Sequence, residues 1–193
     1  MNILTIDVTS AKLVVACSKG EEIKYKISQE SGKKHNALIM PYIEEILIEQ
    51  NLDINDIDVF SCVVGPGSFT GIRIGIATMK ALSFATNKKT IAINALEELA
   101  YKKDGHFITA IDALHGNYYY AEFENSFLNV KEMGCKDISE IKNKNLEIVY
   151  KDKECDPYKL IEITTIKANE GLFQTLEPVY LRKSQAERDL DGE

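Results

Sequence analysis

The chain has 193 residues, of which 45% are hydrophobic and 27% are charged, and its net charge at pH 7 is −7. This length is sufficient for one large domain or two small ones with a buried core. The excess of Asp and Glu disfavours independent binding to nucleic acid or to an anionic membrane, because such binding needs clustered Lys and Arg.

The cysteines and the start of the chain bear on its cellular compartment. The four cysteines are far apart and form no C-x-x-C pair, which disfavours structural zinc and a disulfide framework. No uncharged apolar run reaches the roughly 18 residues of a membrane span. The first residues, MNILTIDVTSAKLVVAC, lack the basic start of a signal peptide. We therefore expect a cytoplasmic protein that does not contact a membrane.

The first part of the chain alternates between strand and helix patterns. Three short β-branched stretches predict successive antiparallel strands, and helical spacing of apolar residues begins at His35. The expected strands are residues 2–8, 12–18, 21–28, 58–64 and 90–94, and the expected helices are residues 35–50, 70–87 and 95–103. Strands alternating with helices predict an α/β architecture with a largely covered sheet.

The second part of the chain resembles the first. The stretch ILTIDVTSAKLVVAC can be laid over TAIDALHGNYYYAEF with Asp7 on Asp112, so that in both an apolar strand ends in Asp and a second strand returns. Further strands are expected at 126–133 and 146–150, with a short helix near Ile138 and a longer one from Pro157. We therefore expect two related halves, residues 1–103 and a shortened half at 104–193.

Patterns for independent catalysis are weak. The three histidines lack the context of a metal or nucleophile site, and a G-x-S-x-G elbow around Ser68 would need Gly where Thr70 stands. A structural hydroxyl that caps the following helix is the alternative role for Ser68. Asp7 and Asp112 are compatible with the phosphate loops of actin-like ATPases, or with solvated carboxylates that begin tight turns. Neither has the adjacent glycine that a phosphate loop requires.

The helix expected after the glycine-rich stretch GPGSFTGIRIG has two apolar sides. Gly71, Gly75, Thr78 and Leu82 fall on one line at 100° per residue, and Ile72, Ile76 and Met79 form a bulkier face beside it. The bulkier face can pack on the sheet. The line of small residues lets a second helix approach, either the 35–50 helix of this chain alone or a partner's helix in addition.

Several motifs together resemble the bacterial TsaB (YeaZ) family of threonylcarbamoyladenosine biosynthesis proteins. The most specific is GPGSFTGIRIG followed by ATMKALSFA; ILTIDVTS, KKHNALIMPYIEEIL, IDALHGNYYYAEF and EPVYLRKSQAE extend the resemblance over nearly the whole chain. The resemblance implies an actin-like ATPase (ribonuclease H-like) fold in two halves, without catalysis, metal or cofactor of its own. Ala95 and Leu99 stand where the family's catalytic paralogue, TsaD, has its two metal-binding histidines.

The resemblance also implies partners. TsaD is expected to bind directly, TsaE to join a larger assembly, and tRNA to bind only through the complex. From the pattern of the two helices we also expect a homodimer of the isolated chain, because their joint apolar face would otherwise be exposed. The expected partner interface lies on the 35–50 and 70–87 helices and consists of His35, Ile39, Tyr42, Ile43, Ile46, Gly71, Ile74, Gly75, Thr78 and Leu82. The alternatives are an actin-like ATPase or small-molecule kinase, against which the missing phosphate-loop glycines count, and a peptidase.

Overall fold

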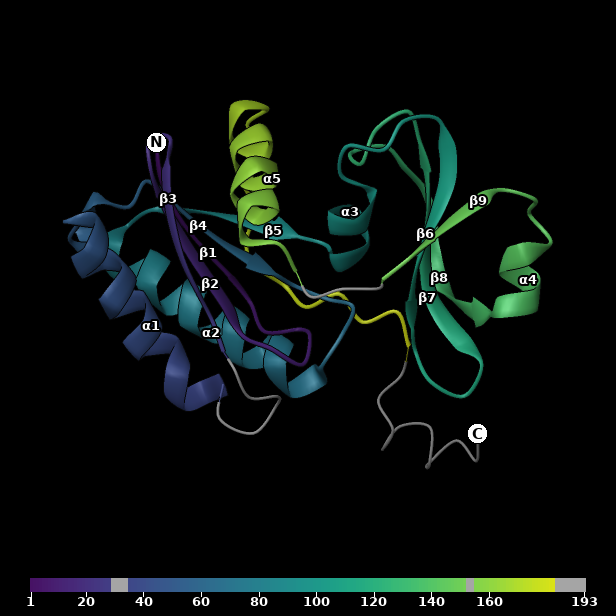
Figure 1. Cartoon of the computed structure of the whole chain (residues 1–193), viewed down its shortest axis with the longest axis horizontal. Helices are drawn as coiled ribbons and strands as arrows, with labels where there is room; N and C mark the ends of the chain where they lie inside the picture. Colours follow the sequence, from purple (N-terminus) through teal and green to yellow (C-terminus); the bar gives the residue numbers. More distant parts are fainter. Residues whose placement is uncertain (29–34, 152–154, 183–193) are drawn as a thin grey trace.

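In the computed structural model the described residues are 1–28, 35–151 and 155–182. They form two β-sheets that lie side by side, with helices packed against both (Figure 1). None of the helices in these ranges combines the length and apolar character needed to cross a membrane.

The first sheet has the strand order β3-β2-β1-β4-β5. Its strands are β1 (Asn2–Asp7), β2 (Val14–Lys19), β3 (Glu22–Ile27), β4 (Val59–Val63) and β5 (Lys89–Ile93). The first three strands pair antiparallel and β1, β4 and β5 pair parallel. As parallel neighbours require, helices separate these strands along the chain: α1 (His35–Gln50) precedes β4 and α2 (Phe69–Thr86) precedes β5.

The two faces of this sheet carry different helices. Leu4 and Ile6 of β1 belong to an apolar cluster with buried residues of α1 and α2. Ile3, on the opposite face, packs with Ile161 of α5 (Pro157–Asn169). Alternation along the strands therefore places α1 and α2 on one side and α5 on the other (Figure 1).

The second sheet repeats the first without a fifth strand. Its strands are β6 (His106–Asp112), β7 (Asn117–Glu124), β8 (Val130–Asp137) and β9 (Glu147–Tyr150), in the order β8-β7-β6-β9. The first three are again antiparallel and β9 is parallel to β6. In place of α1 stands α4 (Ile138–Lys142), with 5 residues against 16. The predicted α/β actin-like fold of two related halves, the second reduced, is confirmed.

One predicted strand is displaced along the chain. We expected a strand at residues 126–133, but β8 begins at Val130 and ends at Asp137. Ser126 and Asn129 instead close a turn, in which the Asn129 N–H donates to the Ser126 carbonyl oxygen at 3.0 Å. The apolar Phe127 within this turn is buried in the core, which explains why the segment resembled a strand.

Each half contributes one helix that packs on the sheet of the other half. The helix α3 (Ala95–Ala100) follows β5 of the first sheet but packs on β6 and β7, whereas α5 follows β9 and packs on β1, β2 and β5. Lys167 of α5 is buried and donates to the Ala92 carbonyl oxygen at 3.0 Å and to the Glu97 carboxylate. The strands of the two sheets lie on either side of the boundary predicted between residues 103 and 104. The helices α3 and α5, however, each pack on the sheet of the other half.

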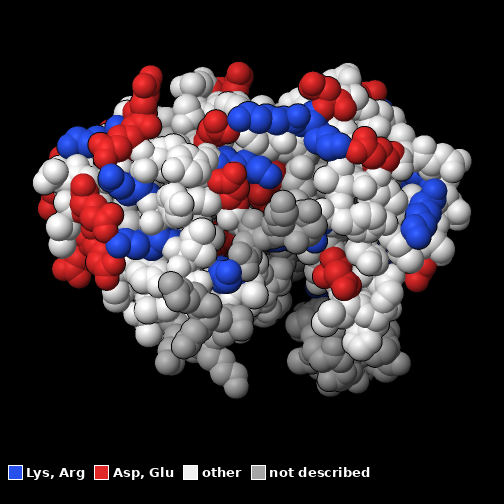
Figure 2. Space-filling model, in the orientation of Figure 1, with Lys and Arg blue, Asp and Glu red and all other residues white. Residues whose placement is uncertain are grey.

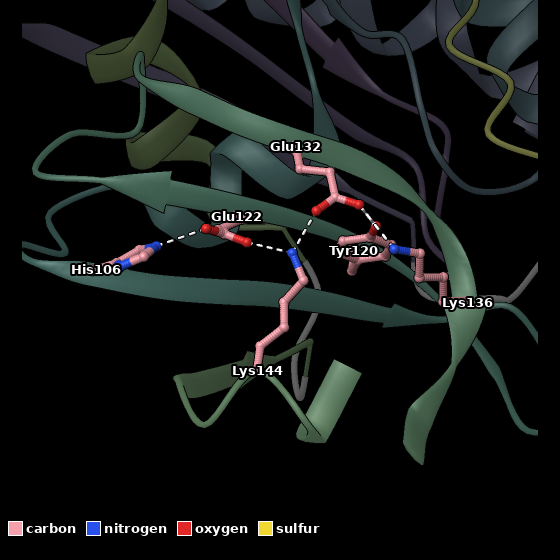
Figure 3. Close-up of polar contacts among 6 residues, drawn as sticks. All are labelled: His106, Tyr120, Glu122, Glu132, Lys136 and Lys144. Carbon is pink, nitrogen blue, oxygen red and sulfur yellow. Dashed lines mark hydrogen bonds and ion pairs between the residues drawn. The ribbon is translucent and has the colours of Figure 1, made fainter. Parts of the chain in front are cut away.

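A polar network covers part of the second sheet on the side of α4 (Figure 3). Lys144 lies between the carboxylates of Glu122 on β7 and Glu132 on β8, and Glu132 also accepts from the Tyr120 hydroxyl. These hydrogen bonds, led by that of Lys144, lower the pKa of Glu132 to about 2. The network joins β7, β8 and the loop after α4 by charge, which compensates for the small apolar core on this side.

Candidate partner-binding surface

The glycine-rich stretch forms the loop from β4 to α2 and begins α2. Gly65 has φ +111 and lies before a cis peptide bond to Pro66. The Ser68 hydroxyl accepts from the Gly71 N–H at 3.2 Å and thereby caps α2, so the structural role considered for Ser68 is confirmed. Neither strand-terminal aspartate is followed by the glycine of a phosphate loop, since Val8 follows Asp7 and Ala113 follows Asp112.

The glycines of α2 face the sheet, which corrects the expected orientation of the small line. A Cβ atom on Gly71 would lie 1.8 Å from the Val8 carbonyl oxygen, and one on Gly75 would lie 3.1 Å from both Cys62 Sγ and a Val8 methyl carbon. Both glycines are buried. They allow α2 to pack closely on β4 and on Val8, which follows β1, and they are not available to a partner helix.

The structure also buries part of the interface predicted on α1. His35, Ile39, Ile43 and Ile46 are at most 7% exposed, and the three isoleucines belong to the apolar core beneath α1, which packs on β2 and β3. Their spacing of three and four residues is that of one helical face, and this face lies on the sheet. These residues therefore hold α1 on its own domain, contrary to the role we predicted for them.

Four of the predicted interface residues remain accessible. Tyr42, Ile74, Thr78 and Leu82 are partly buried, and the three apolar ones pack against the edge of the core. The same two helices carry exposed apolar residues that the sequence prediction did not include: Met40, Ile48, Ala77, Ala81 and Phe84. We call these nine residues the α1–α2 surface. Phe84 is 90% exposed, Ile48 68% and Met40 50%.

A signal for the missed residues was present in the sequence. Ala77 and Ala81 follow the polar Arg73 at intervals of four, so they share its outward face. A solvent-facing stripe of a helix ordinarily carries charged residues, whereas this one continues with alanines and Phe84. The small line that a partner helix could approach is therefore the alanine line.

The strand-terminal aspartates begin tight turns in both halves. An Asp7 carboxylate oxygen accepts from the Thr9 N–H and hydroxyl, each at 2.7 Å, and Asp112 accepts from the Leu114 N–H at 2.7 Å. Asp112 is exposed, but Asp7 is 1% exposed, so the description of both as solvated is wrong for Asp7. This is the turn role that we considered as the alternative to a phosphate loop.

Ala95 and Leu99, the residues at the positions of the paralogue's metal ligands, both lie on α3. Ala95 is the first residue of α3, and Leu99 lies in the next turn of that helix. Within the described ranges no group of three or more His, Cys, Asp or Glu side chains is arranged to hold a metal ion. Cys17, Cys62 and Cys155 are buried thiols, and burial raises the pKa of Cys17 to about 12.

Comparison with known proteins identifies relatives of this chain. The family model described as "TsaD: tRNA N6-adenosine threonylcarbamoyltransferase" matches residues 25–140. The chain is 30% identical to the threonylcarbamoyladenosine biosynthesis protein TsaB of Escherichia coli over 64% of this chain and 55% of that protein. It is 31% identical to TsaB of Buchnera aphidicola from Schizaphis graminum, over 63% and 60% respectively. The matches thus span little more than half of these relatives.

Solved structures agree on the fold. YeaZ from Pseudomonas aeruginosa superposes with a TM-score of 0.74 at 20% identity, covering 93% of this chain and 99% of that one. A second Pseudomonas aeruginosa structure, described as similar to peptidase YeaZ, gives 0.78 at 19% identity. The family model covers more than half of the chain, and the curated relatives and superposed structures carry the names TsaB and YeaZ. The chain therefore belongs to the TsaD family and, within it, to the TsaB (YeaZ) members.

Proposed function

We propose that this chain is a non-catalytic subunit in the synthesis of N6-threonylcarbamoyladenosine in tRNA, and that its α1–α2 surface binds the catalytic paralogue TsaD. Membership of the family supports the pathway, and the names of the curated relatives describe the same biosynthesis. Ala95 and Leu99 support a role without catalysis, because neither side chain can ligate a metal. The complex works in the cytoplasm, and TsaE joins it there.

The exposure of large apolar side chains on the α1–α2 surface carries this proposal. Phe84, Ile48 and Met40 are exposed on the two helices that cover one side of the first sheet, and α2 also carries the exposed Ala77 and Ala81. Apolar side chains gathered on a helical face mark interaction sites in soluble proteins. Alanines at intervals of four residues let another helix pack closely between them, so the surface suits a helical partner.

The paralogy of the two proteins explains why one surface serves two kinds of dimer. TsaD belongs to the same family, so its first half presents corresponding helices to those of this chain. A surface that matches a paralogue's equivalent helices also matches a second copy of itself. In the absence of TsaD we expect a two-fold homodimer through the same residues, and TsaD competes with it.

Charge argues for tRNA contact through the complex. The net charge of −7 opposes the release of counterions on which affinity for tRNA depends. On the face displayed in Figure 2, Lys and Arg side chains alternate with Asp and Glu over both sheets. The partners therefore supply the surface that attracts tRNA.

The proposal is tested with Phe84→Ser and, as a matched control, Leu172→Ser. Both replace an exposed apolar side chain, but Leu172 follows α5 on the opposite side of the first sheet and is 45% exposed. We expect Phe84→Ser to weaken TsaD binding in calorimetry by roughly tenfold or more, as loss of an aromatic anchor does. Leu172→Ser should bind TsaD as the wild-type chain does. Normal TsaD binding by a folded Phe84→Ser protein would place the interface elsewhere.

A further inference from the structure

The segment that follows α5 passes from the first sheet toward the second. We call residues 174–182 the strap; in Figure 1 this segment runs in yellow from beneath α5 toward the second sheet. The strap contains no helix or strand, yet it contacts β5, the loop before α2, the start of α2 and the second half in turn. Its contacts therefore join parts of the molecule that the two sheets leave separate.

The first part of the strap is anchored on the first half. The Gln174 N–H donates to the Thr90 carbonyl oxygen at 3.0 Å, and the Thr90 hydroxyl donates to the Gln174 carbonyl oxygen. Thr90 lies on β5, the last strand of the first sheet, so these bonds cover part of a sheet edge. Leu176 is fully buried in the apolar cluster that contains residues of α1 and α2.

The middle of the strap lies directly on the loop between β4 and α2. The Val179 N–H donates to the Val64 carbonyl oxygen at 2.9 Å. A Cβ atom on Gly65 would lie 2.9 Å from the Val179 carbonyl oxygen, and the φ of Gly65, +111, is one that other residues rarely adopt. The first glycine of GPGSFTG thus leaves room for the backbone of the strap.

The last part of the strap connects the start of α2 with the second half. The Tyr180 ring stacks on Phe69, with ring centroids 4.4 Å apart, and the Tyr180 hydroxyl accepts from Arg73 Nε at 2.9 Å. The Arg73 guanidinium lies 4.2 Å from the centroid of the Phe69 ring. Arg182 donates to the Ala113 carbonyl oxygen at 3.0 Å, in the turn between β6 and β7. One segment therefore touches both α2 and the hairpin turn of the second half.

We propose that the strap is a conformational device that opens and closes as one unit and, when closed, fixes the start of α2 against the second half. Among residues 174–182, all of which the structure describes, only Leu176 is buried, and Tyr180 is 40% exposed. Segments with few buried apolar contacts open at a lower free energy than the core. Opening removes Tyr180 from α2 and Arg182 from the second half, while both sheets keep their own cores. The proposal does not depend on the identity of any protein partner.

The test is native-state hydrogen exchange of the full chain, read residue by residue by nuclear magnetic resonance. The N–H groups of Gln174 and Val179 report on the strap, and those of β1 serve as the core reference. The Ile72 N–H, which donates to the Ser68 carbonyl oxygen at 2.8 Å, reports on the first turn of α2. We expect Gln174 and Val179 to share one protection factor, lower than that of β1, because they open together.

Tyr180→Ala loosens the strap, and Tyr158→Ala is its matched control. Tyr158 on α5 is also exposed and also packs against one aromatic ring, that of Tyr25, with ring centroids 5.6 Å apart. Tyr180→Ala should accelerate exchange of both strap amides by about tenfold, the effect of losing an aromatic stack and a contact with Arg73. Exchange at Ile72 should also become faster. Tyr158→Ala should leave all three amides unchanged.

A milder variant keeps the proposal testable if Tyr180→Ala does not fold. Tyr180→Phe loses only the hydrogen bond to Arg73 and should accelerate the same three amides by a smaller factor. Strap amides that exchange as slowly as those of β1 would show that residues 174–182 belong to the core. Unequal responses of Gln174 and Val179 would show that the strap is not one unit, and an unchanged Ile72 would show that it does not hold α2. Each of these three results overturns the proposal.

Discussion

Replacing Gly71 by alanine places a methyl group against the backbone of β1's end and tests the close packing of α2 on the sheet. The added Cβ would lie 1.8 Å from the Val8 carbonyl oxygen, and backbone at this distance cannot rotate away as a flexible side chain can. The helix or the strand end has to move, and both are buried here. Strain from overpacking commonly costs about 1–3 kcal/mol, and for Gly71→Ala we expect the upper end or more.

The same argument predicts a graded series. A Cβ on Gly75 would lie 3.1 Å from Cys62 Sγ and a Val8 methyl carbon, so Gly75→Ala needs only small side-chain shifts. Its strain is offset by the gain of up to about 1 kcal/mol from replacing glycine inside a helix. Gly75→Leu adds three further carbon atoms to this space and should destabilise the chain itself by at least about 3 kcal/mol. If the small line faced a partner helix, as the expected interface implied, this variant would instead fold and lose only its partner.

Urea unfolding followed by circular dichroism measures these differences, with Ala81→Gly as the control. Ala81 is exposed on the same helix, so this control should lose only about 1 kcal/mol of helix propensity. We expect the largest fall in the unfolding midpoint for Gly71→Ala and Gly75→Leu, and the smallest change for Gly75→Ala. A Gly71→Ala chain as stable as the wild type would refute the close packing of α2 on Val8.

Three further predictions concern the charged groups and the proposed function. Because the folded-state pKa of Glu132 is lowered to about 2, mainly by Lys144, its contribution to stability is present above its unfolded pKa and is lost as the pH falls toward 2. The stability advantage of the wild type over Glu132→Gln, measured by urea unfolding, should therefore shrink from about pH 5 downward; a constant difference would contradict this. The purified chain should hold no stoichiometric metal and hydrolyse neither ATP nor peptides, given Ala95 and Leu99 at the ligand positions; metal analysis and turnover assays check this. Filter binding should detect only weak, non-specific tRNA binding by the chain alone at physiological salt, and sub-micromolar affinity would contradict the charge argument.

The elements of the first half could be predicted because local patterns and tertiary packing agree there. Helical spacing from His35 to Gln50 and the β-branched stretch ending at Val63 match α1 and β4 closely. Prediction was poorer in the second half, where β8 is polar and partly exposed. There the adjacent apolar residues Phe127 and Leu128 belong to a turn, in which Phe127 is buried, so the pattern placed the strand too early.

The accessible surface could not be predicted because periodicity shows which residues share a helical face but not which way that face points. Ile39 and Ile43 were assigned to a partner, although they complete the core of their own half. Gly71 and Gly75 of α2 were likewise assigned to a partner interface, whereas they permit close contact with Val8 of the same chain. Both errors have one cause, because residues that pack on a sheet and residues that pack on a partner follow the same spacing.

The sequence by itself determined the order of elements, the duplicated hairpins whose first strands end in Asp7 and Asp112, and the family, because these follow from local patterns and motifs. Only the tertiary structure decided that α3 and α5 cross between the two sheets, that Gly71 faces the sheet, and that Phe84 lies exposed. It also placed the strap across β5, the start of α2 and the turn after β6. These features depend on the orientation of helices against sheets, which is set by contacts between segments far apart in the chain and is not encoded in any one of them.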